Sequence, residues 1–317
     1  MRTLVTGGAG FIGSHLVDAL VERGDEVVVL DDLSSGKGSN LETATAAGAI
    51  LLEGDITDPE AVSNAVAGSR PEQIFHLAAQ IDVRQSLADP VFDLGVNVGG
   101  TINLLEAAAE SGASRLIFAS TGGAIYGEGK DRDLPLPEEA DQRPDAPYGQ
   151  SKLAAEGYLG LYGRQRGIST VALRLGNVYG PRQDPHGEAG VAAIFCGALL
   201  EGRAPKVFGD GLQTRDYIFV TDVVRAFLAA SDDPNVTGPL NVGTGQEASI
   251  FDVGNAIAEA LGMKFEPEMA PHRPGEVQRI AIDSGLAAQR LGWRAKVELK
   301  DGLARTAAWA RANRDGA

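Results

Sequence analysis

Short apolar runs alternate with amphipathic stretches along the first half of the chain. Six runs predict buried strands, at residues 2–5, 26–30, 49–52, 73–77, 115–118 and 170–173. Between them, apolar residues recur with helical spacing at residues 13–22, 59–66 and 148–166. Alternating strands and helices predict an α/β fold: a Rossmann-type, doubly wound parallel sheet with helices on both faces.

The pattern loosens after about residue 176, where Gly, Pro and charged residues punctuate the chain. Helices are still predicted at residues 221–230, 250–261 and 299–312. We therefore predict two domains. Residues 1–175 form the parallel sheet, and residues 176–317 form a smaller, mixed α/β substrate domain, whose later segments return to the first.

Composition narrows the classes of function. The net charge of -15 argues against a nucleic-acid partner. The single cysteine, Cys196, permits no intramolecular disulfide, and the four histidines show no metal-ligand spacing, so no metal is expected. No apolar run is long enough for a bilayer, and the N-terminus has no signal-peptide layout. These features predict a cytoplasmic protein that does not bind membranes.

A glycine-rich string follows the first predicted strand and opens the first helix. It contains Gly7, Gly10 and Gly13, with Phe11 and Ile12 at the start of the helix. Glycines there let the backbone approach a pyrophosphate, whose charge the helix N-terminus binds. The second strand ends in Asp31 and Asp32, acids placed for the adenine-side ribose; a carboxylate there repels the extra phosphate of NADP. The string predicts a site for NAD.

Three further places at the strand ends are candidates for cofactor contacts. Asp55 and Ile56 follow the third strand, and a carboxylate there can hold the adenine amino group. Small residues after the fourth strand, in Leu77, Ala78 and Ala79, would let the cofactor lie across the sheet edge. Asn97 could bond a strand-end backbone, although chance placement explains it nearly as well. For Asp58, followed by a proline, a helix cap is the favoured interpretation.

Tyr148 and Lys152 are four residues apart, on one face of a predicted helix. A nearby ammonium and a positive nicotinamide ring both favour phenolate, which predicts a lowered pKa for Tyr148. Lys152 can also reach the nicotinamide ribose. A third group must hold the substrate oxygen, and Ser120 or Thr121 can supply that hydroxyl, unless both only close the following turn. This set predicts hydride and proton chemistry at an alcohol carbon.

These motifs resemble the extended short-chain dehydrogenase/reductase family and, within it, the UDP-sugar 4-epimerases. The resemblance runs over nearly the whole chain, from the glycine-rich string through Tyr148 and Lys152 to the late arginines. It implies that NAD takes a hydride from C4 of UDP-glucose or UDP-galactose and returns it to the other face of a 4-keto sugar. Tyr148 is then the base, Lys152 its electrostatic support, and Ser120 or Thr121 the hydroxyl partner.

The resemblance also assigns contacts to the nucleotide sugar in the second domain. It implies that Asn177 binds the diphosphate-sugar, that Arg215 and Arg273 clamp the diphosphate, and that Glu276 holds the uridine ribose. The expected substrate-binding residues are Asn177, Val191, Lys206, Phe208, Arg215, Arg273 and Glu276.

The chain departs from the family at two positions that matter for substrate and mechanism. Gly122 stands where many relatives carry the catalytic Ser or Thr, and Ile280 stands where a large aromatic residue excludes N-acetyl sugars. UDP-glucuronate and UDP-N-acetylglucosamine therefore remain alternative substrates. A nucleotide-sugar 4,6-dehydratase is a weaker alternative, because Gly122 and Gly123 replace the Asp-Glu pair which that reaction needs. A non-catalytic NAD-binding sensor is a further alternative. The presence of Tyr148 and Lys152 argues against it, because a sensor would not need them.

A homodimer is expected by analogy with relatives that pair through two helices of the first domain. Here these are residues 91–110 and 148–166. The face containing Leu104, Leu105, Ala108 and Ala109 fits a helix–helix contact between subunits, and it fits an intrachain core equally well.

Overall fold

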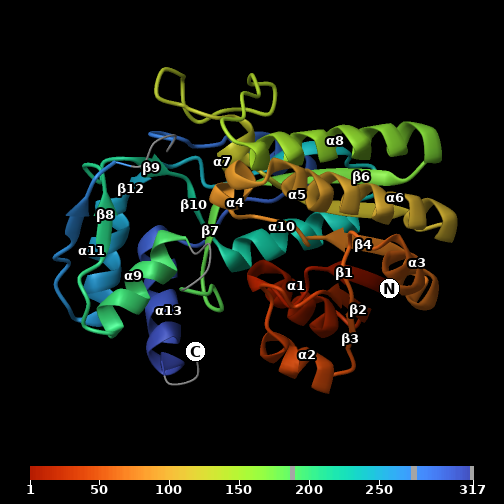
Figure 1. The fold of residues 1–317 in the computed structure, drawn as a ribbon, viewed down its shortest axis with the longest axis horizontal. Coiled ribbons are helices and arrows are strands. Elements are labelled where there is room, and N and C mark those ends of the chain that lie inside the picture. Colours follow the sequence, from red (N-terminus) through yellow and green to blue (C-terminus); the bar gives the residue numbers. More distant parts are fainter. Residues whose placement is uncertain (186–189, 273–276, 315–317) are drawn as a thin grey trace.

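The computed structural model describes residues 1–185, 190–272 and 277–314 of the chain (Figure 1). Seven parallel strands form its central sheet, in the order β11-β6-β5-β4-β1-β2-β3. Their bounds are Arg2–Thr6 (β1), Glu26–Asp31 (β2), Ile50–Glu53 (β3), Gln73–His76 (β4), Arg115–Thr121 (β5), Ser169–Leu175 (β6) and Gly238–Val242 (β11). The strand order reverses between β1 and β4, which is where open α/β sheets bind ligands.

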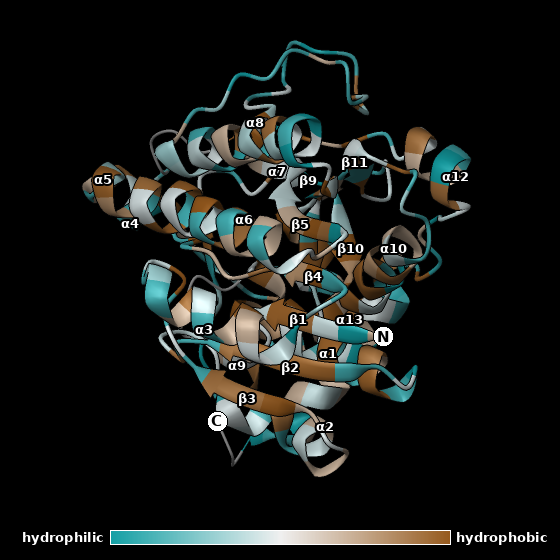
Figure 2. Ribbon diagram, turned by 90° about the vertical axis from the view of Figure 1, so that its right-hand side faces the viewer, coloured by the Kyte–Doolittle hydropathy of each residue, from teal (hydrophilic) through white to brown (hydrophobic). Residues whose placement is uncertain are grey.

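Helices cover both faces of this sheet, as the alternating pattern predicted. Figure 2 shows the mostly apolar strands between layers of amphipathic helices. One core contains residues of α1 (Phe11–Glu22), η1 (Gly38–Leu41), α2 (Glu42–Ala46), α10 (Val220–Asp232) and α12 (Gly285–Leu291). The other contains residues of α3 (Pro59–Ser69), α6 (Gly100–Ser111) and α8 (Pro147–Arg166). The predicted Rossmann-type sheet is confirmed.

The second half of the chain builds a separate apolar core beside the sheet (Figure 1). Three helices surround it: α9 (Val191–Leu200), α11 (Ile250–Leu261) and α13 (Leu299–Ala312). Three two-stranded sheets, which the sequence pattern did not predict, pair β7 (Asn177–Tyr179) with β10 (Tyr217–Phe219), β8 (Lys206–Phe208) with β13 (Glu268–Ala270), and β9 (Thr214–Arg215) with β12 (Ala248–Ser249). These strands are two or three residues long, too short for a periodicity to show.

The helix that carries Leu104, Leu105 and Ala108 packs inside its own chain. All three side chains have no exposed surface, and they belong to the core shared with α3 and α8. Of the two interpretations of this face, the structure therefore selects the intrachain core.

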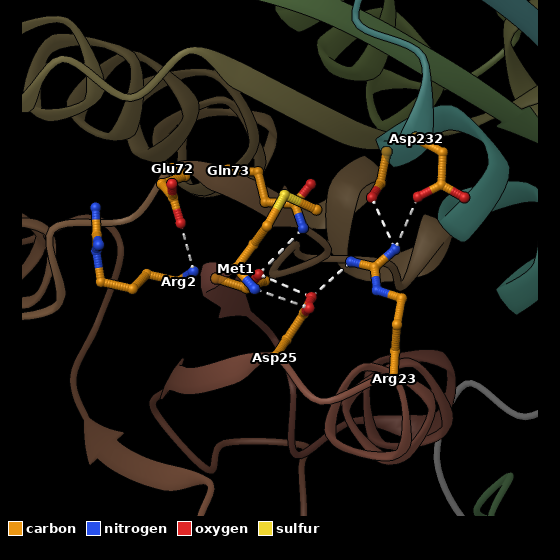
Figure 3. Close-up of polar contacts among 9 residues, drawn as sticks. Met1, Arg2, Arg23, Asp25, Glu72, Gln73 and Asp232 are labelled. Atoms are coloured by element: carbon orange, nitrogen blue, oxygen red, sulfur yellow. Dashed lines mark hydrogen bonds and ion pairs between the residues drawn. The ribbon is translucent and has the colours of Figure 1, made fainter.

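Ion pairs between charged side chains stabilise the end of the sheet where β1 and β2 begin, opposite the glycine-rich turn (Figure 3). Asp25 accepts from the Met1 ammonium at 3.1 Å and pairs with Arg23 at 2.5 Å. Arg23 reaches α10 as well, where it pairs with Asp232 at 3.1 Å. The Asp25 side chain is only 5% exposed, so these contacts tie β1, the turn before β2 and α10 together at a buried charge.

Candidate active site

The glycine-rich turn joins β1 to α1 and lies against the end of β4. A Cβ at Gly7, which has a φ of 71°, would lie 2.5 Å from the Ala78 nitrogen. A Cβ at Gly13 would lie 2.1 Å from the Gly7 oxygen, so only glycine fits at both places. Gly10 is the N-cap of α1 and offers no side-chain cap, which leaves the helix N–H groups free to bind an anion. The turn fits the pyrophosphate of a dinucleotide.

The two acids after β2 differ in their surroundings. Asp31 is buried and accepts from the backbone N–H of Ala9 at 2.8 Å and of Leu33 at 2.9 Å. Burial raises its pKa, and these two hydrogen bonds oppose that rise. Asp32 accepts instead from the exposed Ser34, at 3.0 Å from the backbone nitrogen and 2.7 Å from the hydroxyl. Asp31 therefore links the glycine-rich turn to the end of β2, where a ribose would lie.

The other strand-end candidates lie along the same edge of the sheet. Asp55 accepts from the Thr57 N–H at 2.7 Å, and Ile56 is buried in the core beside α6. Asp58 accepts from the Glu60 N–H at 2.9 Å, so the favoured interpretation of Asp58 as a helix cap is confirmed. The half-buried side chains that follow β4 are Leu77, Ala78 and Ala79.

Asn97 lies in η2 (Gly95–Gly99), a π-helical turn before α6. Its side chain bonds both backbone groups of Gln80, accepting at 3.0 Å and donating at 2.9 Å. Its amide nitrogen also lies 3.2 Å from the Ser151 hydroxyl on α8. Asn97 thus fixes the chain after β4 against α8, the strand-end role expected of it.

Tyr148 and Lys152 lie on the first turns of α8, next to the end of β5. The phenol of Tyr148 is hydrogen-bonded to the Thr121 side chain. The ammonium of Lys152 donates to the Ala119 carbonyl at 3.0 Å and lies 4.6 Å from the centre of the Phe118 ring. The sequence-predicted pair is therefore brought together with one of the two expected hydroxyls.

Burial controls the protonation of this pair. It raises the pKa of Tyr148 to about 12, with the Asp93 carboxylate adding to the rise and Thr121 opposing it. Burial lowers the pKa of Lys152 to about 7, opposed by Asp93 and Glu156. The predicted lowering of the Tyr148 pKa is therefore not found in the chain without its nicotinamide cofactor, because burial and the Asp93 carboxylate both raise that pKa.

A neutral histidine lies beside the pair. Burial, together with the charge of Lys152, lowers the pKa of His76 to about 3. Its Nδ1 lies 2.7 Å from the Thr6 hydroxyl and its Nε2 lies 2.9 Å from the Thr101 hydroxyl. Because Thr101 donates its own proton to the Asn97 carbonyl, Nε2 carries the histidine proton.

The two candidate hydroxyls have different partners. Ser120 is buried and donates to Glu156 at 2.6 Å, and Glu156 pairs with the buried Arg174 at 2.7 Å. Thr121 accepts from the Ala124 N–H at 3.3 Å at the start of α7 (Gly122–Ile125) and bonds Tyr148. Both are the last residues of β5 rather than following the strand.

A cavity of about 740 Å³ lies between the end of β6 and α9. The predicted substrate residues that line it are Asn177, Val191, Lys206, Phe208 and Arg215. A Cβ at Gly123 would lie 3.4 Å from the Asn177 Oδ1 and 4.0 Å from the Thr121 Oγ1, so this cavity adjoins the reacting centre. Arg273 and Glu276 lie outside the described residues.

The sequence pattern did not reveal two buried acids that lie near the site. Asp216, next to Arg215, accepts from the Thr244 N–H at 2.8 Å and from the Gly245 N–H at 2.9 Å. Asp216 therefore holds the turn after β11 next to the cavity-lining Arg215. Glu156 lies four residues after Lys152, a spacing that could have revealed it. Ile280 is buried in a small cluster with Tyr126, and it is not among the residues that line the cavity.

The described residues hold no group of three or more His, Cys, Asp or Glu side chains suited to a metal ion. Within the same ranges, no helix is long and apolar enough to cross a membrane.

The sheet order and the glycine-rich turn define a Rossmann-type dinucleotide-binding protein, with the Tyr148–Lys152 pair as its candidate reacting centre. The chain belongs to the NAD dependent epimerase/dehydratase family, whose model matches residues 3–243.

Individual relatives are similar to this chain over almost its full length. The chain is 47% identical over 307 residues to the UDP-glucose 4-epimerase of Mycolicibacterium smegmatis, covering 96% of this chain and 97% of that relative. The crystal structure of Thermotoga maritima UDP-glucose 4-epimerase with UDP-glucose superposes with a TM-score of 0.95 at 43% identity, over 99% of this chain and 100% of that one. The crystal structure of the Thermus thermophilus UDP-glucose 4-epimerase complex with NAD superposes with a TM-score of 0.91 at 44% identity, over 98% of this chain and 99% of that one.

Proposed function

We propose that this protein is an isomerase that interconverts UDP-glucose and UDP-galactose by NAD-dependent epimerisation at C4, through a 4-keto sugar. The observation that carries the proposal is the hydrogen-bonded pair of Thr121 and Tyr148, with Lys152 beside it, at the end of a cavity that contains Asn177. The full-length similarity to UDP-glucose 4-epimerases supports the same reaction.

In this proposal Tyr148 exchanges a proton with the sugar 4-hydroxyl, and Thr121 holds the sugar oxygen. Thr121 fits that role better than Ser120, whose hydroxyl donates to Glu156. NAD, when bound, supplies a hydride acceptor and a positive charge. That charge, with the ammonium of Lys152, favours the phenolate that burial disfavours.

The residues proposed to hold NAD are those at the carboxyl edge of the sheet. Gly7, Gly10 and Gly13 admit its pyrophosphate, with Phe11 and Ile12 in the first helical turn. Asp31 and Asp32 are proposed at the ribose; their charge selects NAD over NADP. The further proposed contacts are Asp55, Ile56, Leu77, Ala78, Ala79, Asn97, Tyr148 and Lys152.

The cavity is proposed to bind the UDP part of the substrate. Asn177 and Arg215 would meet the diphosphate-sugar, and Lys206 and Phe208 lie on β8, the strand proposed to run beside the uracil. Val191 begins α9 on the cavity wall. Arg273 and Glu276 complete the proposed set, as contacts to the diphosphate and the uridine ribose.

We also propose that two copies of the chain pair through residues 91–110 and 148–166, which belong to α5 (Pro90–Leu94), η2, α6 and α8, together with the neighbouring α4 (Val83–Ala88). Apolar side chains are exposed there: Leu87 at 61%, Val91 at 76% and Leu94 at 55%. A second copy would cover them, as the family resemblance leads us to expect. Light scattering should give twice the chain mass, and Val91→Asp should halve it; Leu212→Asp, at an exposed residue of the other domain, is the control.

The function is tested by a product assay. Purified protein receives UDP-glucose, UDP-galactose, UDP-glucuronate and UDP-N-acetylglucosamine separately, without added reductant, and NMR reads the configuration at C4. Interconversion of the first two supports the proposal. Exclusive turnover of the N-acetyl sugar would instead identify UDP-N-acetylglucosamine as the substrate. A 4-keto product would indicate a dehydratase, and no turnover a sensor.

A further inference from the structure

Two carboxylates act on the charge of Lys152. Its side chain is 2% exposed, and Asp93 and Glu156 each raise its pKa against the effect of burial. Asp93 belongs to α5 and Glu156 lies one helical turn after Lys152 on α8. Two carboxylates beside one ammonium leave open which of them balances its charge.

Glu156 is already neutralised by another residue. Its Oε1 accepts from the Ser120 hydroxyl at 2.6 Å and from Arg174 Nε at 3.0 Å. Its Oε2 accepts from Arg174 Nη2 at 2.7 Å. This ion pair is buried, with side-chain exposures of 9% for Glu156 and 2% for Arg174. A full positive charge therefore already faces Glu156.

Asp93 has no such partner among the residues that the structure describes. It is 1% exposed, and its Oδ1 accepts only from neutral amides, those of Gln80 and Asn97, each at 3.1 Å. Its Oδ2 is buried and makes no hydrogen bond within those same ranges. A charged carboxylate that is buried without a cation is costly, and a cation nearby reduces that cost.

We propose that Asp93 is the counter-ion of Lys152, a positioning residue that keeps this ammonium charged next to Tyr148. The inference rests on the proposed function, because it assigns the charge balance of the same reacting centre. Asn97 holds Asp93 in place and also contacts Ser151, the residue before Lys152 on α8. The packing of α5 and η2 against α8 thus sets the position of the carboxylate.

Among the described residues around the pair, no other group can supply this charge. Glu156 is paired with Arg174, His76 from β4 is neutral, and Thr121 from β5 carries none. Without the anion at Asp93, the pKa values of Tyr148 and Lys152 both fall, since Asp93 raises each of them. Lys152, with a pKa of about 7, would then be largely uncharged at neutral pH.

The test is Asp93→Asn, which keeps the shape and the amide-accepting oxygen but removes the charge. Both limbs of the pH profile of kcat should move to lower pH by about one unit. The matched control is Asp89→Asn, an exposed carboxylate that caps the same helix, where Asn caps equally well. Its profile should stay in place. Unchanged limbs in Asp93→Asn would overturn the proposal.

A second readout does not depend on turnover. In protein labelled with ¹³C-lysine, the Cε resonance that is missing in Lys152→Met reports the titration of Lys152 directly. It should titrate about one pH unit lower in Asp93→Asn than in the unaltered chain. An unshifted titration of Lys152 would overturn the assignment of Asp93 as its counter-ion. If Asp93→Asn does not fold, Asp93→Ser removes the same charge. A chain that turns over no UDP-sugar refutes the proposed function, while this titration still decides the role of Asp93.

Discussion

Gly122 lies directly against Ile282: a Cβ built at Gly122 would be 2.6 Å from Ile282 Cδ1. Ile282 is 1% exposed and packs with Tyr126 and Leu136, so it has little room to move. The position where many relatives carry a catalytic hydroxyl is thereby closed to a side chain. In the proposed site the hydroxyl comes instead from Thr121, which bonds Tyr148 from the preceding position.

Gly122→Ser should destabilise the protein by about 1–3 kcal/mol, because the added atoms overpack the contact with Ile282. Thermal or urea unfolding measures the loss. Gly122→Ser combined with Ile282→Val should recover part of it, and Gly123→Ser, where a Cβ meets nothing closer than 3.4 Å, should cost less. Equal losses at Gly122 and Gly123 would contradict this steric account.

Thr121→Ala should lower kcat by about 10²-fold, since one hydrogen bond to the reacting oxygen is lost. Thr121→Ser restores the hydroxyl and should restore most of the rate. Ser120→Ala should act mainly on stability, because Ser120 donates to Glu156 in the buried ion pair with Arg174. The reverse pattern, with Ser120→Ala losing more turnover than Thr121→Ala, would assign the role to Ser120.

Tyr148→Phe should reduce turnover by about 10²–10⁴-fold, the usual contribution of a general base, while NAD still binds. The measurement pairs the rate of C4 epimerisation with the amount of NAD bound. Tyr158→Phe, which alters a partly exposed tyrosine on the same helix, is the control and should retain full activity. Full activity in Tyr148→Phe would contradict the proposed mechanism.

Asp25 should contribute to stability at neutral pH and not in acid. Burial tends to raise its pKa, but Arg23 and the Met1 ammonium outweigh it and lower the pKa below its usual value. A carboxyl whose pKa is lowered by folding stabilises the protein above the unfolded-state pKa, near pH 4, and this contribution disappears as pH falls through the lower folded pKa. Asp25→Asn should therefore lower the melting temperature at pH 7 and leave it nearly unchanged near pH 2. Asp232→Asn, at a side chain 66% exposed, is the control and should change it little at either pH.

Much of the fold follows from local pattern. The six apolar runs correspond to β1–β6, and the helix predicted at residues 250–261 matches α11 (Ile250–Leu261). The tiny sheets of the second half did not show in the pattern, because two or three residues carry no periodicity. They exist through pairing between distant segments, such as Lys206–Phe208 with Glu268–Ala270.

The sequence by itself determined the glycine-rich turn and the shared face of Tyr148 and Lys152, because both are local geometry: a turn that only glycine permits, and residues one helical turn apart. Tertiary structure alone decided that Thr121 and not Ser120 meets Tyr148, that Leu104 faces the core, and that Asp93 acts on the charge of Lys152. Those outcomes depend on how α5, α8 and β5 pack. Packing joins residues that are distant in the chain, and it also sets the burial that raises the pKa of Tyr148 to about 12.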